Sequence, residues 1–162
     1  MTSPNVTLVL IISAAALAGL AVTQTRDAVL YNHSPSIPVG FYLRTDGVVT
    51  RSAIVTVRAS DVAPIEARLR NFDGPRDRFI KHVAGLGGDV VCASGSEVSV
   101  NGRRVAVRSA ADSRGRRLQD WQGCHRLRGD ELFLLGDTPE SFDSRYWGPV
   151  RRSQIEGVWR RL

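Results

Sequence analysis

The chain has 162 residues, of which 43% are hydrophobic, and this size and composition suit one folded domain with a short appendage. Its formal net charge is +6, from 22 basic and 16 acidic residues. The arginines are scattered apart from one run at residues 114–117, and no aromatic side chains alternate with that run. Nucleic acid is therefore not an expected partner, and a basic face beside anionic lipid explains the charge equally well.

The N-terminal segment is apolar. No charged side chain precedes Arg26, and nearly every residue of 6–22 (VTLVLIISAAALAGLAV) is apolar or small. At a rise of about 1.5 Å per residue, this stretch approaches the roughly 30 Å of a bilayer core. We expect residues 1–26 to be a retained membrane anchor and residues 27–162 to form an exported β-rich domain. A cleaved signal peptide is the alternative, because residues 16–18 (ALA) have the small-x-small form, but the positively charged leading segment is missing.

Beyond the anchor, short segments of strand composition alternate with turn signals. The expected strands cover residues 41–44, 53–57, 78–83, 90–92, 97–100, 103–107, 131–136 and 155–159. Asn101-Gly102 predicts a two-residue hairpin turn, and residues 60–70 predict a short helix capped by Ser60 or Asp61. Residues 108–128 are polar and arginine-rich, which predicts an exposed excursion. The fold class is therefore mainly β, with short strands and many turns.

The two cysteines, Cys92 and Cys124, lie outside any C-x-x-C motif or His/Cys cluster, so we expect no metal site. If the domain is exported, a disulfide between them is the natural expectation. Two unpaired buried thiols remain the alternative.

Lys81 is the only lysine among the 22 basic residues, and it lies in an apolar run followed by Gly85, Gly87 and Gly88. An arginine keeps its proton in a protein, whereas a lysine in a dry pocket can lose it. Lys81 is therefore a candidate general base. The alternative is a lysine on a strand edge whose charged end reaches solvent.

Two further segments concentrate reactive side chains. In the first, Pro35 and Pro38 restrict the backbone around Ser36, and Gly40 permits a tight turn. A hydroxyl on such a rigid loop suits a nucleophile, because positioning supplies much of the rate. The second, residues 136–149 (GDTPESFDSRYWGP), places hydroxyls, carboxylates and an arginine after a buried strand.

Together these segments resemble the type I signal peptidase family of Ser/Lys proteases. Residues 36–42 (SIPVGFY) are similar to the S-x-P-x-G-x-Y motif of the TraF-type conjugative-transfer peptidases. Residues 79–89 (FIKHVAGLGGD) resemble the family's lysine box, with Gly87 where proline is usual, and residues 136–148 resemble its last box. The resemblance implies an antiparallel β-domain of the signal-peptidase kind behind a single N-terminal transmembrane helix. It also implies a serine endopeptidase.

The resemblance assigns roles to individual residues. Ser36 would be the nucleophile and Lys81 its base, with Ser141 orienting the amine. The backbone N–H of Ser36 and the hydroxyl of Ser34 would stabilise the oxyanion. A second set, Asp143 and Arg145, would form a structural ion pair that holds the loop. A direct catalytic role for Asp143 is the alternative.

Other catalytic arrangements fit less well. A Ser-His-Asp triad would combine Ser34 or Ser36 with a histidine and Asp143. The histidines are His33, His82 and His125. His82 follows Lys81 on an expected strand, so its side chain should point to the opposite face. The S-x-x-K arrangement of penicillin-binding proteins is absent, and the N-terminal span replaces the DNA-binding domain of LexA-like repressors.

The resemblance also implies the partners. The substrate would be a membrane-embedded precursor, such as a pilin or another conjugative-transfer protein, that is hydrolysed or cyclised. The lipid bilayer would be the second partner; no cofactor is expected, and we expect a monomer. The location would be the bacterial inner membrane with the catalytic domain on the periplasmic face, although Arg26 weakly favours the cytoplasmic side. A general leader peptidase and a non-catalytic binding module of the transfer apparatus are the competing functions.

Overall fold

The computed structural model describes residues 27–162, so the expected anchor at residues 1–26 lies outside the described part of the chain. The strands are β1 Val29–Asn32, β2 Gly40–Thr45, β3 Ile54–Arg58, β4 Arg78–Gly85, β5 Val90–Ser94, β6 Glu97–Val100, β7 Arg103–Val107, β8 Gly123–Arg126, β9 Glu131–Leu135, β10 Val150–Arg151 and β11 Ile155–Arg161. The helices are α2 Ala59–Val62, α3 Pro64–Leu69 and α4 Ser144–Trp147, with a 3-10 turn, η2, at Arg152–Gln154. Within residues 27–162, no helix has the length and apolar character that crossing a membrane requires.

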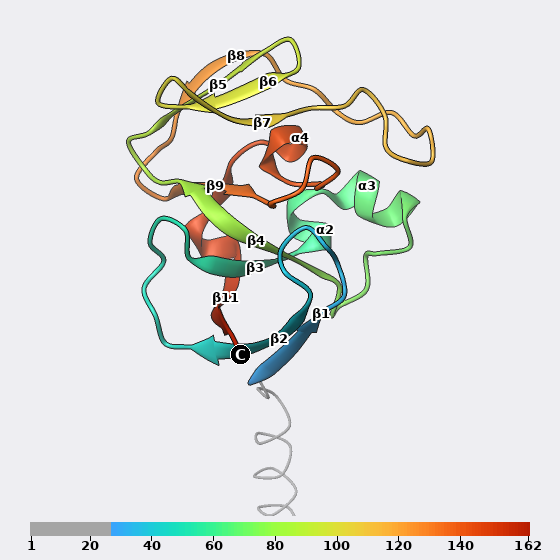
Figure 1. The fold of residues 1–162 in the computed structure, drawn as a ribbon, viewed down its shortest axis with the longest axis vertical. Helices are drawn as coiled ribbons and strands as arrows, with labels where there is room; N and C mark the ends of the chain where they lie inside the picture. The colour runs from blue at the N-terminus through green and yellow to red at the C-terminus, as the bar shows by residue number, and fades with distance from the viewer. Residues whose placement is uncertain (1–26) are drawn as a thin grey trace, which may run out of the picture.

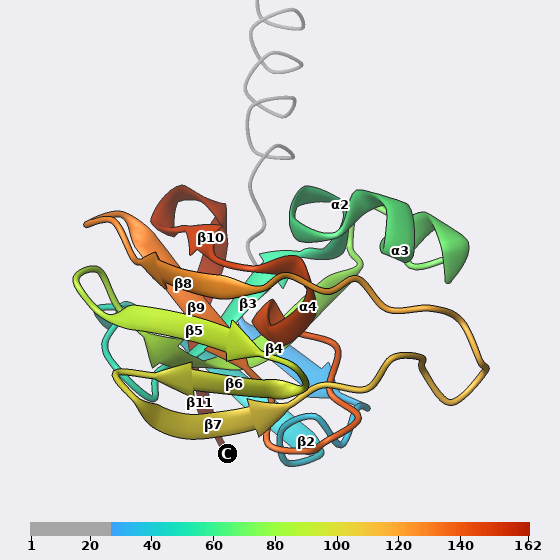
Figure 2. The same ribbon diagram turned by 90° about the horizontal axis from the view of Figure 1, so that it is seen from above.

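Two antiparallel sheets make up the described chain, which confirms the expected mainly β fold. The larger sheet has seven strands in the order β1-β2-β11-β3-β4-β9-β10, and the smaller has four in the order β7-β6-β5-β8. The smaller sheet lies at the end of the molecule opposite the β1–β2 edge, and α4 lies between it and β9 (Figure 1). Seen from above, the loop between β7 and β8 extends well away from both sheets (Figure 2).

The central strands are hydrophobic because side chains on both faces are buried. In β9, residues Leu132 to Leu135 are all buried. One face contributes to a core under the smaller sheet, where Phe133 packs with Val91 and Val98. The other contributes to a core where Leu134 packs with Val55 and Val83. β9 therefore joins the two halves of the domain.

The hairpin between β6 and β7 turns at Asn101 and Gly102, whose φ angles are 52° and 78°, as the Asn-Gly signal predicted. The predicted helix at residues 60–70 is wrong in detail, because it is two short helices separated at Ala63. No side chain caps either helix. Pro64 occupies the first turn of α3, where its missing N–H costs nothing, and this explains the break.

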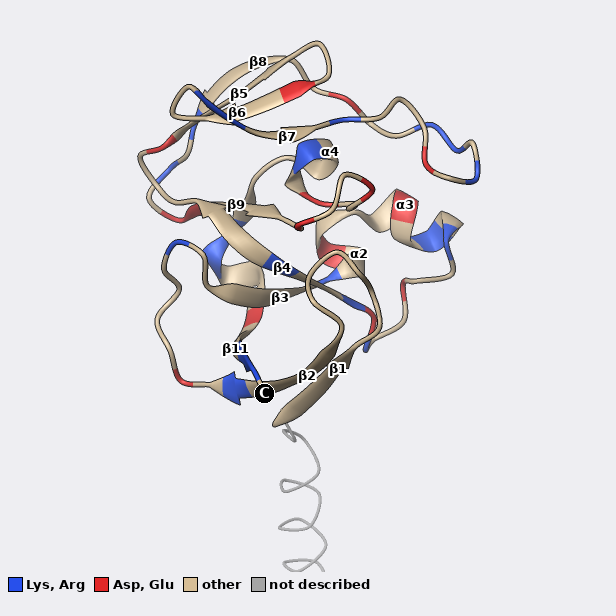
Figure 3. Cartoon of the chain, in the orientation of Figure 1, with Lys and Arg blue, Asp and Glu red and all other residues tan. Residues whose placement is uncertain are grey.

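The excursion predicted at residues 108–128 is only partly correct. Its last part is the edge strand β8, which pairs with β5. The two cysteines lie directly opposite each other in this pairing, and Cys92 and Cys124 form a disulfide, as expected for an exported domain. Basic residues are spread over both sheets and the connecting loops (Figure 3).

Candidate active site

The Ser36 loop connects β1 to β2 and is held by two buried side chains. The amide nitrogen of Asn32 donates to the carbonyls of Ser34 (2.8 Å) and Ile37 (3.1 Å), and its oxygen accepts from the Ser34 N–H (3.0 Å). The hydroxyl of Tyr42, which is fully buried, donates to the Pro38 carbonyl at 2.5 Å. These bonds hold the loop from both sides, so Ser36 has a fixed position although it lies outside regular structure.

Ser34 and Ser36 contact each other within this loop. The Ser34 hydroxyl donates to Ser36 Oγ at 3.1 Å and accepts the Ser36 backbone N–H at 3.2 Å. The two donors expected to stabilise an oxyanion therefore lie together and are engaged with each other. A substrate carbonyl oxygen would take over these donors on binding.

Lys81 is buried on β4, with only 3% of its surface exposed. Its amine donates to the Ser141 hydroxyl at 3.0 Å. The pKa of Lys81 is lowered from 10.5 to about 8, chiefly by burial; the field of Asp143 opposes the shift, that of Arg145 adds to it, and that of Asp137 opposes it. At pH 7 roughly a tenth of a lysine with this pKa is neutral, which is enough for it to act as a base. The alternative, in which its charged end reaches solvent, is wrong.

One cleft of about 370 Å³ brings together Ser34, Ser36, Lys81 and Ser141, with Phe142 on its wall. Within residues 27–162, no hydrogen bond joins Ser36 to Lys81; Ser36 Oγ accepts from Ser34, and the Lys81 amine donates to Ser141. A proton transfer from Ser36 to Lys81 would therefore require Ser36 Oγ to turn from Ser34 toward the amine. Unliganded active sites often show such loose geometry, which tightens when the substrate binds.

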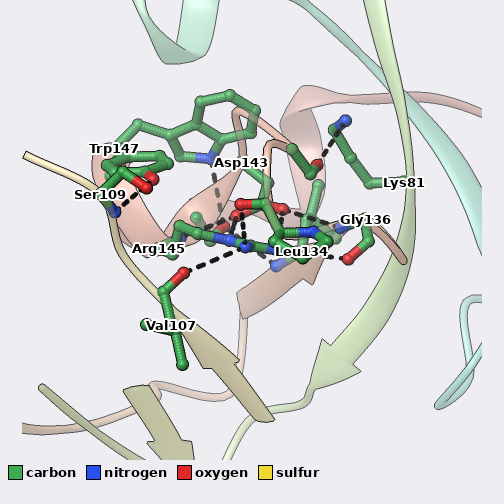
Figure 4. A network of polar contacts seen from close by, with 12 residues as sticks. Lys81, Val107, Ser109, Leu134, Gly136, Asp143, Arg145 and Trp147 are labelled. Carbon is green, nitrogen blue, oxygen red and sulfur yellow. Dashed lines mark hydrogen bonds and ion pairs between the residues drawn. The ribbon is translucent and has the colours of Figure 1, made fainter. Parts of the chain in front are cut away.

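Asp143 and Arg145 form a buried, bidentate ion pair (Figure 4). The distances are 2.8 Å from Arg145 Nε to Oδ1 and 3.0 Å from Nη2 to Oδ2. The guanidinium also donates to the carbonyls of Val107 (3.2 Å) and Pro139 (2.9 Å), and Asp143 accepts the Gly136 N–H (2.8 Å). Because every oxygen of Asp143 is occupied, its geometry supports the structural role over the catalytic one.

Gly136 lies against the Ser36 loop, and the space beside it has no room for a side chain. A Cβ there would lie 2.6 Å from the Ser36 carbonyl and would overlap Ser141 Oγ. The next residue, Asp137, donates its N–H to the same Ser36 carbonyl at 2.6 Å. The last box therefore positions both the Ser36 loop and Ser141, the partner of Lys81.

The histidines are engaged elsewhere. In the described chain, no histidine bonds to Ser34, Ser36 or Asp143. His82 Nδ1 is 3.1 Å from the Ser52 carbonyl, and its Nε2 is 3.5 Å from Asp137. His33 packs on Tyr31, and His125 Nε2 is 2.7 Å from Glu131 Oε2. The geometry does not support a Ser-His-Asp triad.

Sequence reasoning assigned no role to Asn32, Tyr42 or Asp137, all of which hold the Ser36 loop. Tyr42 closes the S-x-P-x-G-x-Y motif, and its position there was a signal that could have identified it. Nothing in the sequence distinguishes Asn32 from any other turn residue, because its function depends on three carbonyls that only the folded loop brings together.

Comparison with known proteins places nearly the whole chain in one family. Residues 2–161 match the family model described as signal peptidase, peptidase S26. A plasmid transfer protein TraF from Escherichia coli is 33% identical over 162 residues, which cover 93% of this chain and 86% of that protein. Signal peptidase I V from Bacillus subtilis (strain 168) is 33% identical over 99 residues, which cover 54% of this chain and 59% of that protein.

A crystal structure of a signal peptidase I from Enterococcus faecalis V583 is 22% identical, with a TM-score of 0.42, and covers 70% of this chain and 98% of that chain. The family match over nearly the whole length, together with the TraF similarity, establishes the relationship. The chain belongs to the signal peptidase family, peptidase S26, and is a serine-type peptidase that acts on exported proteins.

Proposed function

We propose that this protein is a membrane-anchored serine endopeptidase that uses Ser36 and Lys81 to process an exported precursor of a conjugative transfer system. The observation that carries the proposal is the buried Lys81 amine, whose pKa is lowered to about 8, in the same cleft as Ser36. A base of this kind can be neutral near physiological pH, and a nucleophile lies beside it.

The proposed reaction begins with transfer of the Ser36 hydroxyl proton to neutral Lys81. Ser36 Oγ attacks the scissile carbonyl and forms a tetrahedral oxyanion. The Lys81 ammonium then gives the proton to the leaving amine, so the peptide C–N bond breaks and an acyl-enzyme remains. Lys81 next takes a proton from the water or amine that attacks the ester. It gives this proton to Ser36 Oγ as the ester bond breaks, so the Ser36 hydroxyl and neutral Lys81 are both restored.

The contacts around the dyad support this sequence. Ser141 accepts a hydrogen bond from the Lys81 amine, which keeps the side chain in the cleft in either protonation state, since its hydroxyl can also donate. The Ser36 N–H and Ser34 hydroxyl lie beside Ser36 Oγ, where an oxyanion would form. The cleft needs no cofactor for this chemistry.

The substrate class follows from the TraF likeness and from the anchor expected at residues 1–26. A tether ending near residue 26 would hold Ser36 close to a membrane, where a membrane-embedded precursor such as a pilin presents its cleavage site. The catalytic domain would lie on the periplasmic face of the inner membrane. A general leader peptidase with broad substrates is the runner-up, supported by the similarity to signal peptidase I V.

Reaction with an acylating lipopeptide tests the proposal. The full chain in detergent micelles is incubated with a lipopeptide that carries an electrophilic carbonyl, and the adduct is mapped by mass spectrometry. We expect acylation of Ser36, none in Ser36→Ala, and at least a thousandfold slower acylation in Lys81→Arg, because arginine keeps its proton. Lys81→Arg reacting at the normal rate would exclude Lys81 as the base. A native chain that forms no adduct would instead support a non-catalytic binding module.

A further inference from the structure

The catalytic cleft continues into a second, more polar cavity. This cavity has a volume of about 220 Å³, and Glu140 and Phe142 line both spaces. On its other side the cleft shares Ser34 with an apolar groove along β1, the free edge of the larger sheet. A polypeptide bound across Ser36 would therefore have the apolar groove on one side and this polar cavity on the other.

Two arginines and a carboxylate form the far wall of the polar cavity. Asp112 accepts from Arg70 Nη2 (3.0 Å) and Arg116 Nε (2.7 Å) through one oxygen. Its other oxygen accepts the backbone N–H groups of Arg114 and Arg116, both at 3.0 Å. Asp112 is therefore saturated and offers little to a ligand.

Arg116 retains unused donors. Only its Nε has a side-chain partner among the described residues, so both terminal nitrogens are free to bind a ligand. The side chain is 33% exposed, which fits a group on the wall of an open cavity. The Tyr146 hydroxyl, which also lines the cavity, accepts the Ser109 N–H at 3.0 Å and still has a proton to donate. Donors thus outnumber acceptors on this wall.

The same wall contacts the catalytic machinery. The Arg70 guanidinium lies 4.9 Å from the centre of the Phe142 ring, and Phe142 follows Ser141, the partner of Lys81. A side chain bound in the polar cavity would therefore lie beside the reacting groups rather than at a remote surface.

We propose that the polar cavity is a substrate subsite that binds a carboxylate side chain, Asp or Glu, on the side of the scissile bond away from the β1 groove. This inference rests on the proposed peptidase function and adds a specificity to it. The Arg116 guanidinium supplies a planar pair of donors that matches a carboxylate. Glu140, on the wall shared with the cleft, disfavours an acid there and so confines the carboxylate to the Arg116 end.

The test uses a peptide library from a bacterial proteome cut with a lysine-specific protease, which leaves Asp and Glu intact. The full chain in detergent micelles cleaves the library, and the new termini are sequenced by mass spectrometry. We expect Asp and Glu to be enriched over Asn and Gln at one fixed position on one side of the cut. Arg116→Gln should lower that enrichment about tenfold, because it removes a charge-assisted pair of hydrogen bonds.

One variant is a matched control, and another should move the enrichment in the opposite direction. Arg114→Gln removes the same charge from the same exposed loop but not from the cavity wall, so it should leave the enrichment unchanged. Glu140→Gln should increase the enrichment. A thermal melt of Arg116→Gln that matches the native chain shows that the loop is intact.

Each outcome has a separate meaning. Cleavage by the native chain without acid enrichment would overturn the subsite while leaving the peptidase function standing. Enrichment that falls equally in Arg114→Gln and Arg116→Gln would reduce the effect to general surface charge and also overturn it. No cleavage by the native chain would overturn both the function and the subsite.

Discussion

Two buried cations lie within the same site, and their surroundings differ in kind. Lys81 is 3% exposed and Arg145 is 2% exposed. Arg145 has a bidentate carboxylate partner and donates to three backbone carbonyls, whereas the Lys81 amine has one neutral hydroxyl partner. The protein pairs the charge of Arg145 directly with a carboxylate, whereas among the described residues the charge of Lys81 is offset only by the fields of Asp143 and Asp137.

The difference separates scaffold from chemistry. An arginine cannot shed its proton, so a buried one must be paired, and the pair in turn holds the last box in place. A buried lysine without such a partner loses its proton more readily, at a cost in stability, which suits the base that we propose. Changes at the two positions should therefore shift stability in opposite directions.

The largest expected effect on stability comes from unpairing Arg145. Asp143→Asn leaves a buried guanidinium without its countercharge, which should lower the free energy of unfolding by about 3–5 kcal/mol. Urea denaturation followed by tryptophan fluorescence measures this change. As a control, the double variant Asp143→Leu/Arg145→Met should recover much of the loss, because neither charge remains buried. A single variant as stable as the native chain would show that the ion pair is dispensable.

Removal of the Lys81 amine should have the opposite sign. The pKa of Lys81 is 10.5 in the unfolded chain and about 8 in the folded chain. At pH 7, folding therefore carries the free-energy cost of that shift. Lys81→Met should therefore stabilise the fold at pH 7 by up to about 3 kcal/mol while abolishing acylation of Ser36.

The gain from Lys81→Met should decline with pH, because native stability rises between pH 8 and 10.5 as the unfolded chain also loses the proton. Denaturation of both chains at pH 7 and pH 10 checks the trend, since groups common to both cancel. A gain equal at both pH values would mean that folding does not lower the pKa of Lys81.

A smaller effect should follow from crowding the partner of Lys81. Gly136→Ala would place a methyl group 2.6 Å from the Ser36 carbonyl and against the Ser141 hydroxyl, so both must shift. We expect acylation by the lipopeptide to slow roughly ten- to a hundredfold, as the geometry of the site loosens. The matched control is Gly129→Ala, where nothing lies within 4 Å of the added carbon. Equal rates in the two variants would mean that the close approach at Gly136 does not matter.

Sequence reasoning located most strands but fewer of the contacts between them. The Asn101-Gly102 turn was predictable because its backbone requirement is local. The helix break at Ala63 also has a local cause, because Pro64 favours the first turn of a helix. The strand at residues 123–126 was not predictable, because it depends on pairing with β5. Edge strands in polar segments have little periodicity to reveal them.

The candidate site divides in the same way. Residue chemistry pointed to Ser36 and Lys81 as candidates, and the resemblance of three motifs to the family added Ser141 as the partner of the amine. That Ser36 Oγ bonds Ser34 rather than the Lys81 amine could not be predicted, because it depends on side-chain rotamers in the folded loop.

By itself, the sequence determined the family, the mainly β class and the single amine able to serve as a base, since these depend on residue types in a fixed order. Only the tertiary structure decided that this amine is buried while the neighbouring arginine is paired. It also decided that a polar cavity adjoins the cleft, because burial and charge compensation arise from residues that are far apart in the chain and meet only in the fold.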